Sequence, residues 1–184
     1  SWDVASGKLL NRTSQQRSVC WLVASKTDNV FLGCFGDRQT RLMSTDDFKV
    51  ITSFPSLLRP RQDFNCATFS ECEQYIQMSG EDNRVLIYDI RSPSMPLHIL
   101  VHVPPTMARG DGTVATWLGP PLALASGGDD GIVRVWDTRL GEPLISAFTG
   151  HQARDSAISA SADGLTLASG GDESLVHLYS ADRS

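Results

Sequence analysis

Two histidines lie four residues apart in the segment PLHILVH, which ends at His102, and imidazole is a common ligand of transition-metal ions. The segment alternates in the manner of a strand, and residues at an even spacing on a strand share one face. His98 and His102 could therefore hold a metal ion together. The pattern favours a simpler interpretation, two half-exposed histidines on an edge strand, and we expect no metal and no cofactor.

The other reactive residue types do not form a catalytic pattern. None of the four cysteines stands in a C-x-x-C pair, and they are interpreted as buried thiols in a reducing setting: Cys20, Cys34, Cys66 and Cys72. The acidic turns GGDDG and SGEDN lack the spaced oxygen ligands of a calcium loop. The sequence contains neither a phosphate-binding loop nor a nucleophile elbow. We therefore expect no enzyme activity.

Composition narrows the possible partners. The chain has 184 residues, a formal net charge of −5 and a pI near 5.3. A clustered basic excess is absent from the sequence, so direct nucleic-acid binding is not expected. No apolar run approaches the roughly 20 residues that a membrane-spanning helix needs. The N-terminal segment lacks the pattern of a secretory signal, and we expect an intracellular protein.

The elements that position these residues follow from an internal repeat. The hexapeptide LASGGD occurs twice, beginning at Leu124 and at Leu167, an offset of 43 residues. An aromatic or apolar position recurs with the same neighbours at intervals of 41, 45, 48 and 43 residues: Trp2, Met43, Tyr88, Trp136 and Tyr179. An acidic turn residue precedes it in four of the units: Asp37, Asp82, Asp130 and Glu173. Periods of 20–50 residues indicate a repeat architecture.

Each repeat contains the signals of short strands joined by turns. In the last one, the strands are expected at Asp155–Ser161, Leu165–Ser169 and Leu175–Tyr179, and Pro143–Phe148 supplies a fourth, outer strand to the unit before it. Four antiparallel strands per unit are typical of a propeller blade. The sequence predicts an all-β fold of about four blades, approximately at residues 17–54, 63–102, 112–148 and 153–180, with residues 1–10 ending a preceding blade.

Three features resemble the WD-repeat family: the Gly150-His151 pair, the two LASGGD hexapeptides, and the segment VRVWD that ends at Asp137. The resemblance covers essentially the whole chain and is strongest from about Phe64 onward. It implies a β-propeller, usually of seven blades, of which these four would be a portion. It also implies a function in binding proteins.

In the family, a Ser, a turn Asp, the His of the Gly-His pair and a Trp form a hydrogen-bonded chain within a blade. The match carries over to Ser126, Asp130 and Trp136 in the third blade, where no His stands at the Gly-His position. In the fourth blade His151 and Ser169 match, whereas Tyr replaces Trp and Glu replaces Asp. The residues expected in these blade networks are Asp37, Asp82, Tyr88, Asp89, Ser126, Asp130, Trp136, Asp137, His151, Ser169 and Tyr179.

An arginine stands two residues after the Asp that ends the third strand in two consecutive blades, as Asp89-x-Arg91 and Asp137-x-Arg139. This is similar to the double motif of WD-repeat receptors that dock on the damaged-DNA-binding adaptor of cullin-4 ubiquitin ligases. The resemblance implies that Arg91 and Arg139 lie on the propeller rim and contact the adaptor, with a substrate bound elsewhere. A rigid guanidinium suits that task because it can make bidentate, charge-assisted bonds.

A second interpretation stays open. Such an arginine can pair with its neighbouring Asp for purely structural reasons, and the chain would then be a scaffold of another nuclear or cytoplasmic complex. The resemblance implies the nucleus more often than the cytoplasm. Both interpretations predict the same fold and differ in what the two arginines do.

Overall fold

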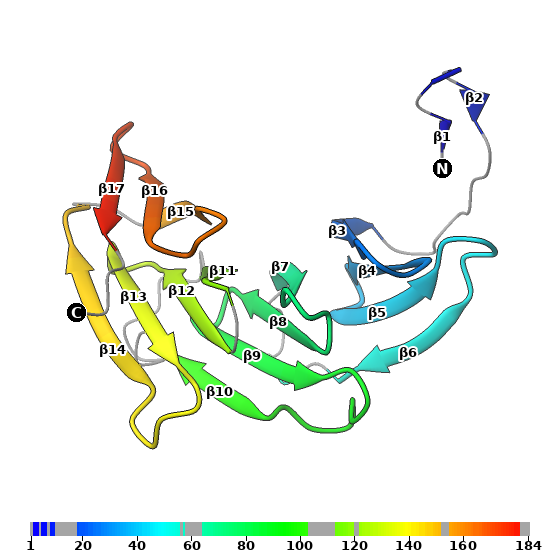
Figure 1. Ribbon diagram of the computed structural model, residues 1–184, viewed down its shortest axis with the longest axis horizontal. Coiled ribbons are helices and arrows are strands. Elements are labelled where there is room, and N and C mark those ends of the chain that lie inside the picture. Colours follow the sequence, from blue (N-terminus) through cyan, green and yellow to red (C-terminus); the bar gives the residue numbers. More distant parts are fainter. Residues whose placement is uncertain are drawn as a thin grey trace.

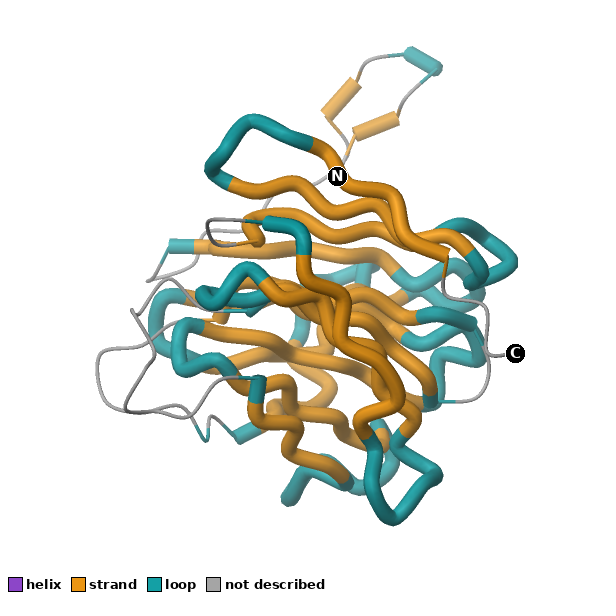
Figure 2. The backbone as a smooth tube through the Cα atoms, turned by 90° about the vertical axis from the view of Figure 1, so that its left-hand side faces the viewer, coloured by secondary structure: helices purple, strands orange, loops and turns teal. Residues whose placement is uncertain are grey.

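The computed structural model describes nine stretches of the chain: residues 2–3, 5–6, 8–9, 18–55, 57, 64–102, 113–119, 122–151 and 155–180. All regular secondary structure in these stretches is β-strand, drawn in orange in Figure 2. Within the same stretches, no helix has the length and apolar character required to cross a membrane.

Four antiparallel sheets follow one another along the chain. The first sheet contains β3 (Val19–Ala24), β4 (Val30–Phe35), β5 (Gln39–Ser44) and β6 (Val50–Phe54). The second contains β7 (Phe64–Phe69), β8 (Tyr75–Gly80), β9 (Arg84–Asp89) and β10 (His98–Val101). The third contains β11 (Val114–Trp117), β12 (Ala123–Gly127), β13 (Ile132–Asp137) and β14 (Leu144–Thr149). The fourth contains β15 (Asp155–Ala160), β16 (Thr166–Gly171) and β17 (Val176–Ser180).

The sheets lie side by side along an arc (Figure 1). Their first strands contact one another in succession, β3 with β7, β7 with β11, and β11 with β15. The third and fourth strands of the first three sheets, and the third strand of the fourth sheet, therefore lie toward the outside of the arc. A separate hairpin of β1 (Trp2–Asp3) and β2 (Lys8–Leu9) stands apart from the arc. The all-β blade architecture predicted from the repeat is confirmed.

The turn between the second and third strands has the same conformation in all four sheets. One residue in each turn has a positive φ, between 58° and 67°: Arg38, Asn83, Gly131 and Ser174. Each follows directly after the aligned acidic residue of its repeat. In the first three sheets the carboxylate of that acid accepts the backbone N–H two residues further on, at 3.2 Å in each case. The recurring Asp thus closes an Asx turn, which explains why the repeat keeps it.

The core consists of three layers, each between two neighbouring sheets. Between the first and second sheets, Phe54 meets Tyr88 edge to face, with ring centroids 5.5 Å apart. Between the second and third, Ile87 and its neighbours pack against Trp136. Between the third and fourth, Val135 packs near Leu167. Because each sheet shares its apolar faces with its neighbours, a blade depends on the next one for burial.

The two ends of the arc expose apolar side chains. Val176 and Leu178 of β17 are 74% and 73% exposed, and Leu22 of β3 is 58% exposed. These values contrast with the central strands, where β9 and β12 are almost completely buried. Such exposed apolar faces on an otherwise well-packed array mark surfaces that pack against further structure.

Candidate docking site and blade networks

The two arginines of the repeated Asp-x-Arg motif adopt the same geometry. Arg91 donates Nε–H to Asp89 Oδ1 at 2.9 Å and Nη2–H to Asp89 Oδ2 at 2.6 Å. Arg139 makes the corresponding pair with Asp137, its Nε–H reaching Oδ1 at 2.8 Å and its Nη2–H reaching Oδ2. In each case the backbone N–H of the arginine also bonds to the same Oδ1, at 2.8 and 3.1 Å. Each motif is therefore a three-bond clamp.

The acidic side chains of the clamps are much less exposed than the arginine side chains. The side chains of Asp89 and Asp137 are 14% and 5% exposed, against 69% for Arg91 and 47% for Arg139. Hydrogen bonds from Arg91 hold the pKa of the Asp89 carboxyl below its usual range. The clamp occupies one edge of each guanidinium, since a guanidinium has five N–H donors and only two are used here. The other N–H donors make no hydrogen bond within the described part of the chain, and both arginine side chains are exposed.

Both arginines lie in the turn that connects the third and fourth strands of their sheets, β9 to β10 and β13 to β14. The two sheets are neighbours along the arc (Figure 1). The motif thus places two like charges on corresponding turns of adjacent blades. The resemblance and the structural alternative both allow this placement, and the local Asp–Arg pairing is the feature that the structural alternative expects.

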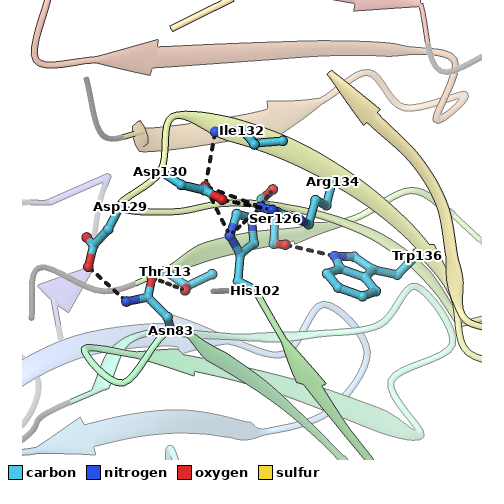
Figure 3. A network of polar contacts seen from close by, with 9 residues as sticks. All are labelled: Asn83, His102, Thr113, Ser126, Asp129, Asp130, Ile132, Arg134 and Trp136. Carbon is cyan, nitrogen blue, oxygen red and sulfur yellow. Dashed lines mark hydrogen bonds and ion pairs between the residues drawn. The ribbon is translucent and has the colours of Figure 1, made fainter. Parts of the chain in front are cut away.

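The third sheet contains a continuous polar network, shown in Figure 3. Trp136 donates its indole N–H to Ser126 Oγ at 2.8 Å, and both side chains are buried. Strand register places Ser126 opposite Arg134, whose guanidinium donates to Asp130 Oδ2 at 2.8 Å. Arg134 Nη1 lies 2.8 Å from Nδ1 of His102, and the His102 Nε2–H donates to the Ser126 carbonyl at 3.1 Å. Ser126, Asp130 and Trp136 are thus joined by Arg134 and His102, neither of which the sequence placed in this network.

The interpretation of His102 as a half-exposed edge-strand residue is wrong. Its side chain is buried, because the chain turns inward after β10 and inserts the imidazole beside the third sheet. His102 thereby fills the position for which no histidine was found in the third blade. Burial, and next the charge of Arg134, lower the pKa of His102 to about 4. His98, in contrast, is only partly buried.

The second and third sheets are also joined by hydrogen bonds of the Asn83 side-chain amide. Asn83 donates from Nδ2 to Asp129 Oδ2 at 2.8 Å and accepts from Thr113 Oγ1 at 3.2 Å (Figure 3). Asn83 is the residue with positive φ in the turn between β8 and β9. One side chain therefore sets a turn in its own sheet and fastens that sheet to the next.

The fourth sheet has a different set of partners. His151 lies between Ser169 Oγ, 2.5 Å from its Nε2, and the carboxylate of Glu173, which contacts its Nδ1. The ring of Tyr179 stacks on Phe148 of the third sheet with centroids 5.0 Å apart. Tyr179 thus uses its ring to join two sheets, whereas Trp136 uses its indole N–H within one sheet. His177 lies beside this group, its ring centroid 4.3 Å from that of His151.

In the first two sheets, the aligned acid pairs with an arginine. Asp37 binds Arg41, and Asp82 accepts Nε–H of Arg84 at 2.5 Å. Tyr88 stands at the Trp position of the second sheet, where it is buried and donates its hydroxyl to the Pro55 carbonyl at 2.9 Å. These contacts lie between sheets or at turns.

The cysteines are not uniformly buried, in contrast to the expectation. Cys34 and Cys66 are buried, and burial raises the pKa of the Cys34 thiol to about 12. Cys20 and Cys72 are exposed. Cys72 lies in the β7–β8 turn, near a hollow of about 400 Å³ that the inner strands of all four sheets line.

Comparison with known proteins agrees with this architecture. Residues 110–137 match the family model described as WD domain, G-beta repeat. The propeller of Dos1 is similar to the whole chain with a TM-score of 0.79 and 26% identity. Rik1-associated factor 1 of Schizosaccharomyces pombe is 34% identical over 58% of this chain, and human F-box/WD repeat-containing protein 8 is 30% identical over 53%.

The chain spans only part of each of these proteins. It covers 47% of the Dos1 propeller chain. The aligned regions make up 18% of the fission-yeast relative and 15% of the human one. The four sheets therefore match part of a larger propeller.

Proposed function

We propose that this chain, a WD40-repeat β-propeller protein, is the substrate-receptor scaffold of a ubiquitin ligase and docks on the cullin-4 adaptor through Arg91 and Arg139. The propeller would bind the adaptor at its rim and present a substrate from another surface. Protein binding is the whole of this activity, and the proposal includes no catalytic step. The proposed location is the nucleus.

One observation carries the proposal: two blades in succession hold an exposed arginine in the same clamp. A surface arginine normally loses considerable side-chain entropy when a partner fixes it. Here the neighbouring carboxylate has already fixed the guanidinium, so a partner that binds the free edge meets a smaller entropic cost. Pre-ordering of this kind, repeated on adjacent blades, suits a docking surface.

The remaining N–H groups indicate the chemistry of the partner surface. Each guanidinium retains donors that the clamp does not use, and a second carboxylate or a row of carbonyl oxygens could accept them. The clamp carboxylates partly neutralise the two charges, which lowers the cost of bringing the arginines into an interface. This surface fits a partner that has two acidic or carbonyl-rich pockets, separated by the distance between two adjacent blades.

The names of two relatives are consistent with this function. Rik1-associated factor 1 is named for its association with Rik1, and the human relative is named for an F-box beside its WD repeats. The first name describes an association with another protein, and the second describes WD repeats in a chain that also carries an F-box. We extend this only as far as the proposal that the present chain also binds a partner protein.

The second candidate function is a scaffold of a different complex, in which the clamps are structural. The observation in its favour is that both arginines are already paired within the chain. Under this alternative, loss of the guanidiniums would loosen the β9–β10 and β13–β14 turns and leave partner binding unchanged. The two candidates therefore differ in a measurable way.

The test is the double substitution Arg91→Ala and Arg139→Ala in the full-length chain, followed by adaptor pull-down and affinity measurement. Loss of two interface anchors is expected to weaken binding by at least about 30-fold, which corresponds to about 2 kcal/mol. Microscopy of the tagged parent protein checks the nuclear location.

A matched control is Lys49→Ala. Lys49 is also an exposed cation, paired with an acid two residues earlier, Asp47, in the corresponding turn of the first sheet. The Lys49→Ala variant should bind the adaptor as well as the parent protein does. If the folded double variant binds the adaptor as well as the parent does, Arg91 and Arg139 are not the docking site. If the parent protein does not bind the adaptor, the ligase proposal is wrong and the structural alternative remains.

A further inference from the structure

The fourth sheet differs from the third at one position that changes its charge balance. In the third sheet, Asp130 pairs with Arg134, four residues later, and the arginine also contacts His102. The first sheet has the same spacing in Asp37 and Arg41. The repeat offset of 43 residues places His177 where the third sheet has Arg134. A permanent cation is therefore replaced by an imidazole.

Three possible metal ligands come together as a result. His151, Glu173 and His177 each offer one ligand atom, and these atoms all lie within 4.8 Å of one another. His177 Nε2 is 3.7 Å from Glu173 Oε1. Ligand atoms around a tetrahedral zinc ion are separated by about 3.3 Å, given bonds of about 2.0–2.1 Å. To meet that geometry, His151 Nδ1 and the Glu173 carboxylate, which are in direct contact, must move slightly apart, and His177 Nε2 must move slightly closer to both.

The hydrogen bonding around the cluster also suits a metal ion. His151 Nε2 is occupied by Ser169 Oγ at 2.5 Å, so its Nδ1 is the nitrogen that faces Glu173. A metal-bound histidine commonly uses its other ring nitrogen in this way, and such a bond fixes the orientation of the ring. His177 Nε2 is buried and makes no hydrogen bond within the described part of the chain. A buried imidazole nitrogen without a hydrogen-bond partner is available as a ligand in the tautomer that leaves its lone pair free.

We propose that His151 Nδ1, Glu173 and His177 Nε2 bind a divalent transition-metal ion, with Zn²⁺ as the ion tested, and that a water molecule completes the coordination. The ion takes the place that the Arg134 guanidinium has in the third sheet. It adds positive charge beside Glu173 and joins the turn after β16 to His151, two residues beyond the end of β14. Nitrogen and carboxylate ligands in this ratio are ones that zinc accepts.

The position of the site gives it a structural role. His151 lies two residues after the outer strand of the third sheet, whereas Glu173 and His177 belong to the fourth sheet. A metal ion bound to all three would fasten the exposed fourth sheet to its neighbour. We therefore expect zinc to stabilise the fourth sheet most.

The first experiment is a calorimetric titration of the metal-free full chain with Zn²⁺, together with thermal melting. We expect about one zinc ion per chain and an increase in the melting temperature. His177→Arg is the decisive variant because it reproduces the Asp–Arg arrangement of the third sheet. It should keep or raise the melting temperature without zinc, and it should weaken zinc binding by at least about 100-fold, more than an outer-shell change does.

Two further variants separate the site from other sites on the chain. Ser169→Ala removes only the partner of His151 Nε2 and should weaken zinc binding by about 10–100-fold. His98→Gln removes a histidine outside the cluster and should leave the affinity unchanged. Zinc binding of equal strength in the parent and in His177→Arg would overturn the proposal, because the ion would then lie elsewhere, for example at the exposed thiols. No binding to the parent at about 1 mM zinc would overturn it as well.

A spectroscopic measurement on the parent keeps the proposal testable if the variants do not fold. Cu²⁺ bound at the same site should show electron paramagnetic resonance couplings to two imidazole nitrogens. A spectrum without two nitrogen couplings would contradict the assigned ligands.

Discussion

The indole N–H of Trp136 lies 2.8 Å from Ser126 Oγ, and both residues are buried in the same sheet. The hydrogen bond joins the third strand of the sheet to the second at the layer shared with the preceding sheet. Both the size of the Trp136 ring and its N–H donor therefore contribute to the stability of the sheet, and substitutions can separate the two contributions.

Trp136→Ala is expected to lower the free energy of unfolding by about 3–5 kcal/mol, since it leaves a cavity and an unpaired hydroxyl. Trp136→Phe retains most of the ring and loses the N–H donor, and it should cost about 1–3 kcal/mol. Denaturant titration measures both. Trp21, which is 41% exposed, provides the control, and Trp21→Ala should cost less than Trp136→Phe. An unchanged stability in Trp136→Ala would show that the alignment of the third blade is wrong.

The buried His102 predicts a pH dependence of stability. Its pKa is lowered from 6.5 to about 4 in the folded chain, by burial and then by Arg134. Between these two values the unfolded chain binds a proton that the folded chain does not, so stability decreases as the pH falls from about 6.5 to about 4. The full loss from this group is about 3 kcal/mol.

Unfolding free energies at pH 7.5 and pH 5 measure this effect. His102→Gln should be less stable at pH 7.5 and should show a smaller decrease between the two pH values. A decrease of the same size in parent and variant would mean that other groups cause it. His98→Gln, at a partly exposed position four residues earlier, is the matched control.

Gly164 occupies a position that excludes any side chain. Its φ is +70°, and a Cβ atom there would lie 2.0 Å from the carbonyl oxygen of Leu118 in the neighbouring sheet. Gly164→Ala should cost at least about 2 kcal/mol, from the left-handed backbone and the clash together. Gly141→Ala is the control because nothing lies within 4 Å of its added Cβ, and a change within about 1 kcal/mol is expected. Thermal denaturation of the two variants tests this difference in stability, and similar melting temperatures would contradict the prediction.

Glu73 joins the first and second sheets. Its carboxylate accepts hydrogen bonds from Ser25 Oγ at 2.5 Å, from the Lys26 backbone N–H at 2.6 Å and from Thr27 Oγ1 at 2.6 Å. Burial opposes ionisation of Glu73, but these hydrogen bonds outweigh it and hold the carboxyl pKa below its ordinary value.

Glu73→Ala should therefore lower the free energy of opening of the turn between β3 and β4 by about 1.5 kcal/mol. Amide hydrogen exchange at Lys26 should then be about tenfold faster. Glu71→Ala, an exposed acid in the same turn as Glu73, should leave that exchange unchanged. Equal protection of Lys26 in Glu73→Ala and in the parent would show that the contact does not stabilise the turn.

The sequence was sufficient to predict the sheets because the same kinds of turn residue recur in every repeat. An acidic residue followed by a left-handed residue ends the second strand in every repeat, and that local chemistry does not depend on the rest of the fold. The Asp-x-Arg motif was equally visible. Its side-chain geometry was not, because a sequence does not show whether an arginine turns toward its neighbouring acid or away from it.

His102 was missed because its spacing is unusual. In the fourth sheet the histidine precedes the bonded serine by 18 residues, as His151 and Ser169. In the third sheet the corresponding separation, from His102 to Ser126, is 24 residues. A search at a fixed repeat offset therefore finds no histidine. A search for a histidine just after an outer strand could have found it. His102 is the first residue after β10, and His151 is the second residue after β14.

The position of these histidines has a consequence for anyone who recombines repeats of this chain. His102 follows the last strand of the second sheet, yet its imidazole belongs to the third; His151 stands in the same relation to the fourth. A chimaera joined at the boundary between sheets, just after the histidine, would give each grafted unit the wrong imidazole. The exchangeable module starts at the histidine and ends before the next one. Duplications or swaps made in that frame keep each network intact.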